Sequence, residues 1–446
     1  MVRKTMVRFM VPVTAAALLA PLPAIAQAGP QYDRAGAELR HEIGDRADRD
    51  IRAFYARRDN APLWFDASGR PSGAATLLLY RLRTAEFDGL NPKKLGADKL
   101  PRLLDKARRG DPDDMARAEL ALSSAFVDYV RGMRAGPALP MIYESDALKP
   151  AVPTPVYALE SAAAAGSLER YVDDMGWMHP FYAPLRKAME DPAYSDVQRR
   201  QIWTNLARAR AIPALTRGRY VLVDAASARL WMYEDGKPVD SMKVVVGKPE
   251  LQTPAMAGFI RHAVHHPYWN VPDDLVQNNI AANVLDKGIG YLKAGGYQVL
   301  DDWRVDAKVI DPKTVDWLAV HEGMRKVHVR QLPGGDNFMG AVKFEFPNPQ
   351  GIYLHDTPDM HLMKLADRQL SSGCVRLEDA NRMHRWLLGK PLPKKGRKAE
   401  AEQLVPLGEP VPIYITYMTV QPRADELTFY SDPYGRDDKV QMALAD

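Results

Sequence analysis

The first half of the chain carries apolar residues at helical spacing, and the second half carries short β-rich runs. Between about residues 35 and 210, apolar side chains recur at intervals of three and four positions, which predicts amphipathic helices. The clearest pattern lies at 114–133, where one side of the expected helix is apolar. That side collects Met115, Leu122, Phe126, Tyr129, Val130 and Met133. Further helices are expected at 74–84, 168–175 and 198–211.

Runs rich in Val, Ile, Leu and Tyr begin at residue 220. They occupy 220–223, 229–233, 243–247 and 411–417. The pair Asp235-Gly236 is a hairpin turn signal between the second and third runs. Regular alternation of strands and helices is missing, which argues against a doubly wound parallel sheet. We therefore predict an α+β multidomain protein, in which a helical N-terminal domain precedes a mostly antiparallel β-sandwich domain.

This pattern also sets the expected boundaries along the chain. The helical domain is placed at 29–195 and a linker helix at 196–216. The β domain follows at 217–420. The polar residues from 421 to 446 are expected to form a C-terminal tail.

The N-terminus has the composition of an export signal. No acidic residue occurs before Asp33, and three basic residues precede an apolar stretch at 10–25. Small residues at 24–28 fit a cleavage site, so we predict a secretory signal peptide at 1–28. The alternative is an uncleaved anchor helix, which three prolines in an already short stretch disfavour. After cleavage, no transmembrane span is expected.

Composition excludes some classes of protein. The 446 residues include 60 basic and 56 acidic side chains, and a net charge of +4 gives no argument for nucleic-acid binding. Hydrophobic residues at 46% indicate a globular chain. There is one cysteine, Cys374. Exported proteins normally pair their cysteines, so this thiol is either a buried small side chain or a reactive group.

The neighbours of the cysteine favour the reactive alternative. Cys374 lies 19 residues after His355, which ends a strand-like run at 352–355. Cysteine catalysis needs a thiolate, a base to form it and donors for a developing oxyanion. Gly373 allows a tight turn that exposes the sulfur. Arg376 would favour the thiolate or hold a substrate carboxylate.

The histidines also allow structural and metal-binding interpretations. A histidine such as His355 is more often structural than catalytic. A metal site at His262, His265 and His266 is disfavoured, because neighbouring residues of a strand point to opposite faces.

The segment from His355 to Arg376 resembles the L,D-transpeptidase catalytic domain of the YkuD type. More narrowly, the chain resembles the YcbB-like branch. The stretches that carry this resemblance are 244–249 with Thr253-Pro254, 267–272, 330–348 and 352–377. Residues 51–64 resemble the scaffold domain of that branch. The peptidoglycan-binding module that often lies between the two domains has no room here.

The resemblance implies a mechanism and a set of site residues. Cys374 would be the nucleophile and His355 the general base, with the backbone N–H groups of Gly373 and Cys374 as oxyanion donors. Substrate contacts would come from the neighbouring side chains, which are Tyr353, Arg376, Ser371, Ser372 and Asp356. A cap insertion over the active site is expected at about 275–332. No metal or organic cofactor is implied.

The resemblance also implies a substrate and a place of action. Cys374 would form a thioester with the third residue of a tetrapeptide stem of peptidoglycan, release D-alanine and transfer the acyl group to a second stem, giving a 3-3 crosslink. Carbapenems would acylate it. The expected location is the periplasm of a Gram-negative bacterium, and other cell-wall synthesis proteins are further expected partners. Three alternatives stay open: hydrolysis by water, attachment of a protein or another amine to peptidoglycan, and a non-catalytic wall scaffold.

Overall fold

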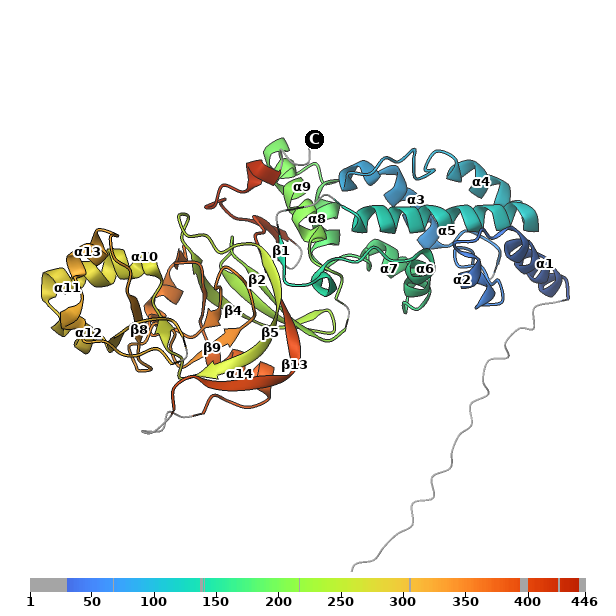
Figure 1. The fold of residues 1–446 in the computed structure, drawn as a ribbon. Helices are drawn as coiled ribbons and strands as arrows, with labels where there is room; N and C mark the ends of the chain where they lie inside the picture. Colours follow the sequence, from blue (N-terminus) through green and yellow to red (C-terminus); the bar gives the residue numbers. More distant parts are fainter. Residues whose placement is uncertain are drawn as a thin grey trace, which may run out of the picture.

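A helical part and a β part, joined by one helix, make up the protein (Figure 1). The computed structural model describes residues 30–440, apart from 67, 137, 138, 140, 216, 305, 394–399, 424 and 425. The predicted signal peptide at 1–28 therefore lies outside the described residues. Within the described residues, no helix combines the length and the apolar character that crossing a membrane requires.

The helical part is built around one long helix. This is α5 (Pro112–Arg134), which confirms the helix predicted at 114–133. Its predicted apolar side is buried, and Asp111 caps its first turn. Figure 1 shows α5 running through the middle of this part, with the shorter helices packed along it. Those helices are α1 (Pro30–Arg46), α2 (Arg52–Ala56), α3 (Gly73–Arg83), α4 (Leu100–Ala107), α6 (Pro155–Ala163), α7 (Leu168–Asp173) and α8 (Tyr182–Ala188).

A buried carboxylate fixes α5 against the helices that lead into the β part. Asp88 is 1% exposed. It accepts hydrogen bonds from the hydroxyls of Tyr129 at 2.7 Å and Tyr182 at 2.9 Å, and from Arg186 Nε at 3.0 Å. A buried charge is tolerated only when it is paired in this way. The next helix, α9 (Asp196–Arg210), thereby takes a fixed place at the border between the two parts.

The β part is a sheet that closes on itself. Its strands run in the order β1-β5-β13-β2-β3-β4-β12-β10-β9, and β9 also pairs with β5. Most pairs are antiparallel, but β1–β5, β10–β12 and β13–β2 are parallel, as is the short strand β11 (Gln369–Ser371) with β4. The other strands are β1 (Ile142–Tyr143), β2 (Arg219–Asp224), β3 (Arg229–Glu234), β4 (Lys237–Gly247), β5 (Met256–His265), β9 (Val342–Glu345), β10 (Leu354–His355), β12 (Val375–Leu377) and β13 (Gln403–Thr416).

The closed sheet encloses one apolar core. Alternate residues of its strands point inward, and helix α14 (Ala380–Leu388) adds Met383 and Leu387 to the same core. The prediction was a sandwich of two layers. In the structure, the pairing of β5 with β9 joins the strands into one continuous sheet around the core. The predicted turn at Asp235-Gly236 joins β3 and β4. Both residues have positive φ, +48° and +76°, as a tight hairpin turn of this kind requires.

A small subdomain is inserted between β5 and β9. It has a three-stranded sheet, β6-β8-β7, and a core of its own. The expected insertion at 275–332 begins earlier, because β6 already pairs with β8. Figure 1 shows this subdomain projecting on the side away from the helical part. Its elements are β6 (Trp269–Asn270), α10 (Asp273–Leu275), a π-helical turn (Val276–Ala281), α11 (Ala282–Lys287), α12 (Gly290–Ala294), β7 (Tyr297–Leu300), α13 (Trp317–His321) and β8 (His328–Gln331).

The prediction of a polar tail at 421–446 is wrong for its described residues. The hairpin β14 (Val420–Arg423) and β15 (Glu426–Phe429) begins the segment. Tyr434 and Val440 beyond it are 4% and 5% exposed. The physical reason is aromatic packing, because the ring of Tyr434 stacks on that of Tyr417 at 5.0 Å between centroids.

Candidate active site

The parallel pair β10–β12 brings the predicted nucleophile and base to one face of the sheet. Leu354 and Val375 are register partners, and both are fully buried in the core. Successive side chains of a strand point to opposite faces. The outer face therefore carries Tyr353, His355, Cys374 and Arg376. The register partner of His355 is Arg376, which lies two positions after Cys374. The strand spacing and the rise per residue then put the Cα atoms of His355 and Cys374 about 8 Å apart.

His355 is held in the tautomer that a base needs. Its Nδ1 lies 2.6 Å from the carbonyl oxygen of Asp356. A carbonyl can only accept, so Nδ1 carries the proton and Nε2 keeps its lone pair. Burial of the ring and the positive charge of Arg376 lower the pKa of His355 to about 3. The imidazole is therefore neutral at neutral pH and able to accept a proton.

Cys374 is a free, partly exposed thiol. Its Sγ lies 3.6 Å from the carbonyl oxygen of Gly351, to which the S–H can donate. Desolvation raises the pKa of Cys374, while the backbone N–H of Tyr353 and the charge of Arg376 oppose the rise. Within the described structure, no direct hydrogen bond joins Cys374 to His355. The resting pair is thus a neutral thiol and a neutral imidazole, rather than an ion pair.

In the loop before the thiol, two predicted site groups are hydrogen-bonded within the protein. Gly373 has φ +114°, which confirms the predicted turn. Its N–H, predicted to bind an oxyanion, already donates to Ser371 Oγ at 3.2 Å. Ser371 was predicted to contact substrate, but it is 2% exposed and its hydroxyl donates to the Cys374 carbonyl at 2.6 Å. The N–H of Cys374 has no acceptor among the described residues, so it is the oxyanion donor that remains.

Thr253, to which the sequence analysis assigned no role, holds the turn at Gly373 in place. Thr253 is fully buried. Its hydroxyl donates to the carbonyl of Gly373 at 2.7 Å and accepts from the N–H of Gly247 at 2.8 Å. Thr253 belonged to a stretch that carries the family resemblance, and this was the available signal. A role could not be assigned without the contact to Gly373.

A second missed residue holds the segment between the two catalytic candidates. Arg368 is 8% exposed, and its guanidinium donates to five backbone carbonyl groups. The segment also contains the 3₁₀ turn η5 (Met360–Lys364). The carbonyl groups belong to Val244, Leu365, Ala366, Ser227 and Ala228.

Two cations lie near the remaining candidates, and both are paired with carboxylates. Arg376 pairs with Asp359, at 3.1 Å from Nη1 to Oδ2. Tyr353 is half-buried, and the ammonium group of Lys343 lies 5.5 Å from its ring centroid. Lys343 also lies opposite His355 on β9 and lowers the pKa of that histidine. Ser372, two residues before Cys374, is exposed. Burial of the ring is the main reason that the pKa of His355 is lowered, and the charges of Arg376 and Lys343 add to it.

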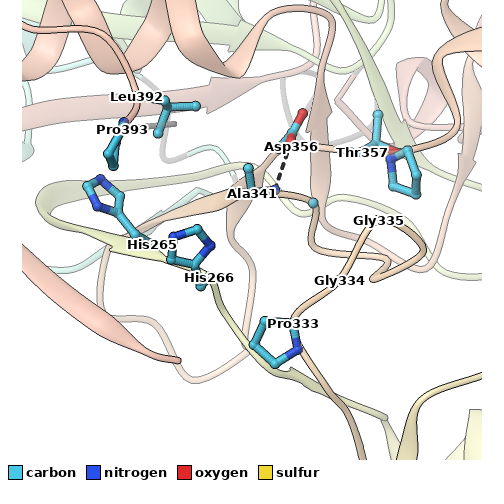
Figure 2. A pocket seen from close by; sticks show the side chains of 12 residues that line it. His265, His266, Pro333, Gly334, Gly335, Ala341, Asp356, Thr357, Leu392 and Pro393 are labelled. Atoms are coloured by element: carbon cyan, nitrogen blue, oxygen red, sulfur yellow. Dashed lines mark hydrogen bonds between the residues drawn. The ribbon is translucent and has the colours of Figure 1, made fainter. Parts of the chain in front are cut away.

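Asp356 serves the site through its backbone more than through its carboxylate. The carboxylate accepts from the N–H of Ala341 at 2.8 Å. It lines a pocket of about 240 Å³ with His265, His266 and Gly334 (Figure 2). Neither Cys374 nor His355 lines that pocket. The predicted substrate contact of Asp356 would therefore lie outside the immediate surroundings of the thiol.

One histidine of this pocket, His265, is held by a second histidine outside it. His265 Nε2 lies 2.9 Å from His384 Nε2, and His384 Nδ1 lies 2.8 Å from the carbonyl of Lys390. Among the described residues, no three His, Cys, Asp or Glu side chains are grouped so as to hold a metal ion.

Comparison with known proteins identifies two domains in the chain. Residues 49–189 match the Scaffold domain, and residues 218–413 match the L,D-transpeptidase catalytic domain, YkuD. A curated protein of Haemophilus influenzae named "Putative L,D-transpeptidase" is 26% identical over 421 residues, which cover 91% of this chain and 82% of that protein.

Two solved structures are similar to the chain over less of its length. An L,D-transpeptidase from Mycobacterium smegmatis is 14% identical, covers 45% of this chain and has a TM-score of 0.23; the match spans 59% of that structure. The catalytic domain of an E. faecium L,D-transpeptidase acylated by ertapenem is also 14% identical. That match covers 45% of this chain and 97% of that structure, with a TM-score of 0.21. TM-scores this low do not themselves establish a shared fold. On the two domain matches, the chain joins a Scaffold domain at 49–189 to an L,D-transpeptidase catalytic domain of the YkuD family at 218–413.

Proposed function

We propose that this protein is a peptidoglycan L,D-transpeptidase that makes 3-3 crosslinks through a thioester on Cys374. The observation that carries the proposal is the pairing of β10 with β12. It puts a neutral His355, with its Nε2 lone pair available, on the same face as the one cysteine of the chain. The periplasm is the proposed place of reaction, in line with the proposed signal peptide.

The first step forms the thioester. As Cys374 Sγ attacks the carbonyl carbon of the third stem residue, His355 Nε2 takes the thiol proton. The N–H of Cys374 donates to the oxyanion that develops. The C–N bond to D-alanine then breaks, and His355 returns the proton to the leaving amine. At rest the thiol hydrogen-bonds to the Gly351 carbonyl, so this mechanism requires the thiol to turn toward His355 before the proton is transferred.

The second step transfers the acyl group. An amine on the third residue of a second stem attacks the thioester, and His355 takes the proton that this amine loses. Collapse of the intermediate breaks the C–S bond, and His355 returns the proton to Sγ. One amide bond is broken and one is formed, so the cycle regenerates the neutral thiol–imidazole pair. Water in place of the amine would give hydrolysis with the same groups.

Product analysis tests the proposal. The purified protein is incubated with tetrapeptide muropeptides, and mass spectrometry follows the products. Transpeptidation predicts release of D-alanine together with dimers joined between third-position residues. Tripeptide monomers without dimers would indicate a carboxypeptidase instead. We also propose that ertapenem acylates Cys374, which predicts one covalent adduct and loss of both products. Intact muropeptides after long incubation would contradict the proposed function.

The protonation state of the resting pair gives a pH prediction. The pKa of Cys374 is raised and that of His355 lies at about 3, so the thiol stays protonated at neutral pH. Alkylation by iodoacetamide should therefore be slow near neutrality and accelerate as the pH rises beyond the ordinary thiol pKa of about 8.5. Intact-mass measurement of the alkylated fraction over time gives the rate. A rate that is already at its plateau at neutral pH would indicate a thiolate–imidazolium pair.

A further inference from the structure

We propose that Tyr434, in the C-terminal segment, is a positioning residue for Cys374 and acts through Thr253. The inference rests on the proposed function, because it concerns the placement of the proposed nucleophile. We call residues 432–437 the C-terminal clasp. The clasp lies far from Cys374 in sequence, and its contacts run to the loop 248–253 that supports the turn at Gly373.

The hydroxyl of Tyr434 holds this supporting loop at both of its ends. It donates to the carbonyl of Gly247 and accepts from the N–H of Thr253 at 3.5 Å. The carbonyl of Tyr434 also accepts from Gln252 Nε2 at 3.2 Å. The loop folds tightly over Gly247, where an added Cβ would meet the carbonyl oxygen of Leu251 at 2.1 Å. Tyr434 thus stabilises a conformation that allows no larger residue at 247.

The supporting loop in turn holds the nucleophile. The Thr253 hydroxyl donates to the Gly373 carbonyl at 2.7 Å, and Gly373 precedes Cys374. Gly373 has φ +114°, a conformation that needs support from its surroundings. One hydrogen-bonded path therefore leads from Tyr434 through Thr253 to the peptide bond that carries the N–H of Cys374. That N–H is the proposed oxyanion donor, so a small displacement of the peptide affects the transition state directly.

The clasp is itself rigidly anchored. Arg436 lies 4.7 Å from the ring centroid of Tyr434, and its Nη2 donates to Gln252 Oε1 at 2.8 Å. The hydroxyl of Tyr417 donates to Asp432 at 2.5 Å and accepts from the N–H of Tyr434 at 3.0 Å. These contacts use the ring and backbone of Tyr434 and leave its hydroxyl free for the loop. Removing the hydroxyl alone should therefore keep the clasp folded.

The same clasp reaches the helix that connects the two parts of the protein. Asp437 pairs with Arg208 of α9, at 2.5 Å from Oδ1 to Nη1. The guanidinium of Arg208 also lies 5.1 Å from the ring centroid of Tyr417. The position of Cys374 is thus tied, through the clasp, to the border with the helical part.

Four variants test the role of Tyr434. Tyr434→Phe and Thr253→Val each remove one hydroxyl of the path, and Thr253→Ser keeps it. Tyr414→Phe is the matched control, because its buried hydroxyl donates to Leu148 at 3.3 Å, outside the path. The loss of one hydrogen bond predicts a fall in kcat of roughly tenfold for Tyr434→Phe and for Thr253→Val, with KM unchanged. Thr253→Ser and Tyr414→Phe should keep the wild-type kcat.

Two further measurements separate positioning from stability and from the proposed function. The double variant Tyr434→Phe with Thr253→Val should lose no more than either single variant, since both interrupt one path. Alkylation of Cys374 by iodoacetamide, which needs no oxyanion donor, reports on the position of the thiol itself, so its rate should change in Tyr434→Phe and stay at the wild-type value in Tyr414→Phe. An unchanged kcat and alkylation rate in Tyr434→Phe, or an equal loss in Tyr414→Phe, would overturn the inference. If the wild type releases no D-alanine, the proposed function fails, and the alkylation rates still decide the role of Tyr434.

Discussion

Cys374→Ala should abolish D-alanine release from tetrapeptide stems, with a fall in rate of about 10⁴-fold or more. The chain has no second cysteine. The hydroxyl of Ser371, three residues earlier, is buried and donates to the Cys374 carbonyl, so it cannot replace the thiol. The measurement is single-turnover release of D-alanine, followed by mass spectrometry. Ertapenem should also leave the mass of this variant unchanged.

Folding must be controlled separately for this variant. The Cys374 thiol donates one weak hydrogen bond, to the Gly351 carbonyl at 3.6 Å. Its removal should leave the thermal unfolding temperature close to that of the wild type. A variant that unfolds at the wild-type temperature and still releases D-alanine at the wild-type rate would exclude Cys374 as the nucleophile.

His355→Gln should lower kcat by about 10²- to 10⁴-fold, the usual contribution of a general base. Glutamine keeps a polar side chain but cannot take up the thiol proton. The deficit should shrink as the pH rises, because deprotonation of the thiol by the solvent then replaces the base. In the wild type, His355 is neutral at every pH well above about 3. Protonation of His355 should therefore cause no fall in the wild-type kcat near neutral pH. Stopped assays across the pH range measure both trends.

A second histidine in the same segment is the natural comparison. His361 lies on the turn η5 and is exposed. His361→Gln changes the same chemical group near the site without touching the outer face of β10. It should keep the wild-type kcat and pH profile. Equal losses in His355→Gln and His361→Gln would show that neither histidine acts as the base.

Local signals in the sequence were sufficient for much of the fold. The helix at 114–133 was predictable because its apolar face follows the helical period. The turn at Asp235-Gly236 was predictable because both residues tolerate the positive φ that a tight hairpin needs. The turn at Gly373 was predictable for the same reason. In each case the signal in the sequence lies within a few residues.

The parts that could not be predicted depend on contacts between distant residues. The hydrogen bond between the N–H of Gly373 and the hydroxyl of Ser371 could not be predicted, because the conformation of the turn directs these two groups at each other. The segment after 420 looked like a tail because its composition is polar. Its fold depends on the stacking of Tyr434 on Tyr417 and on Arg436, which no local pattern reveals.

The pairing of β5 with β9 also makes the inserted subdomain a replaceable module. His265, the last residue of β5, is the register partner of Val342, the first residue of β9. The insertion therefore leaves the sheet and returns to it at the same point, as a long hairpin connection would. Lengthening a closed connection costs little, about 0.6 kcal/mol for each doubling. Chains with the same closed sheet can therefore carry shorter, longer or different modules here while the strands that bear Cys374 and His355 stay in register.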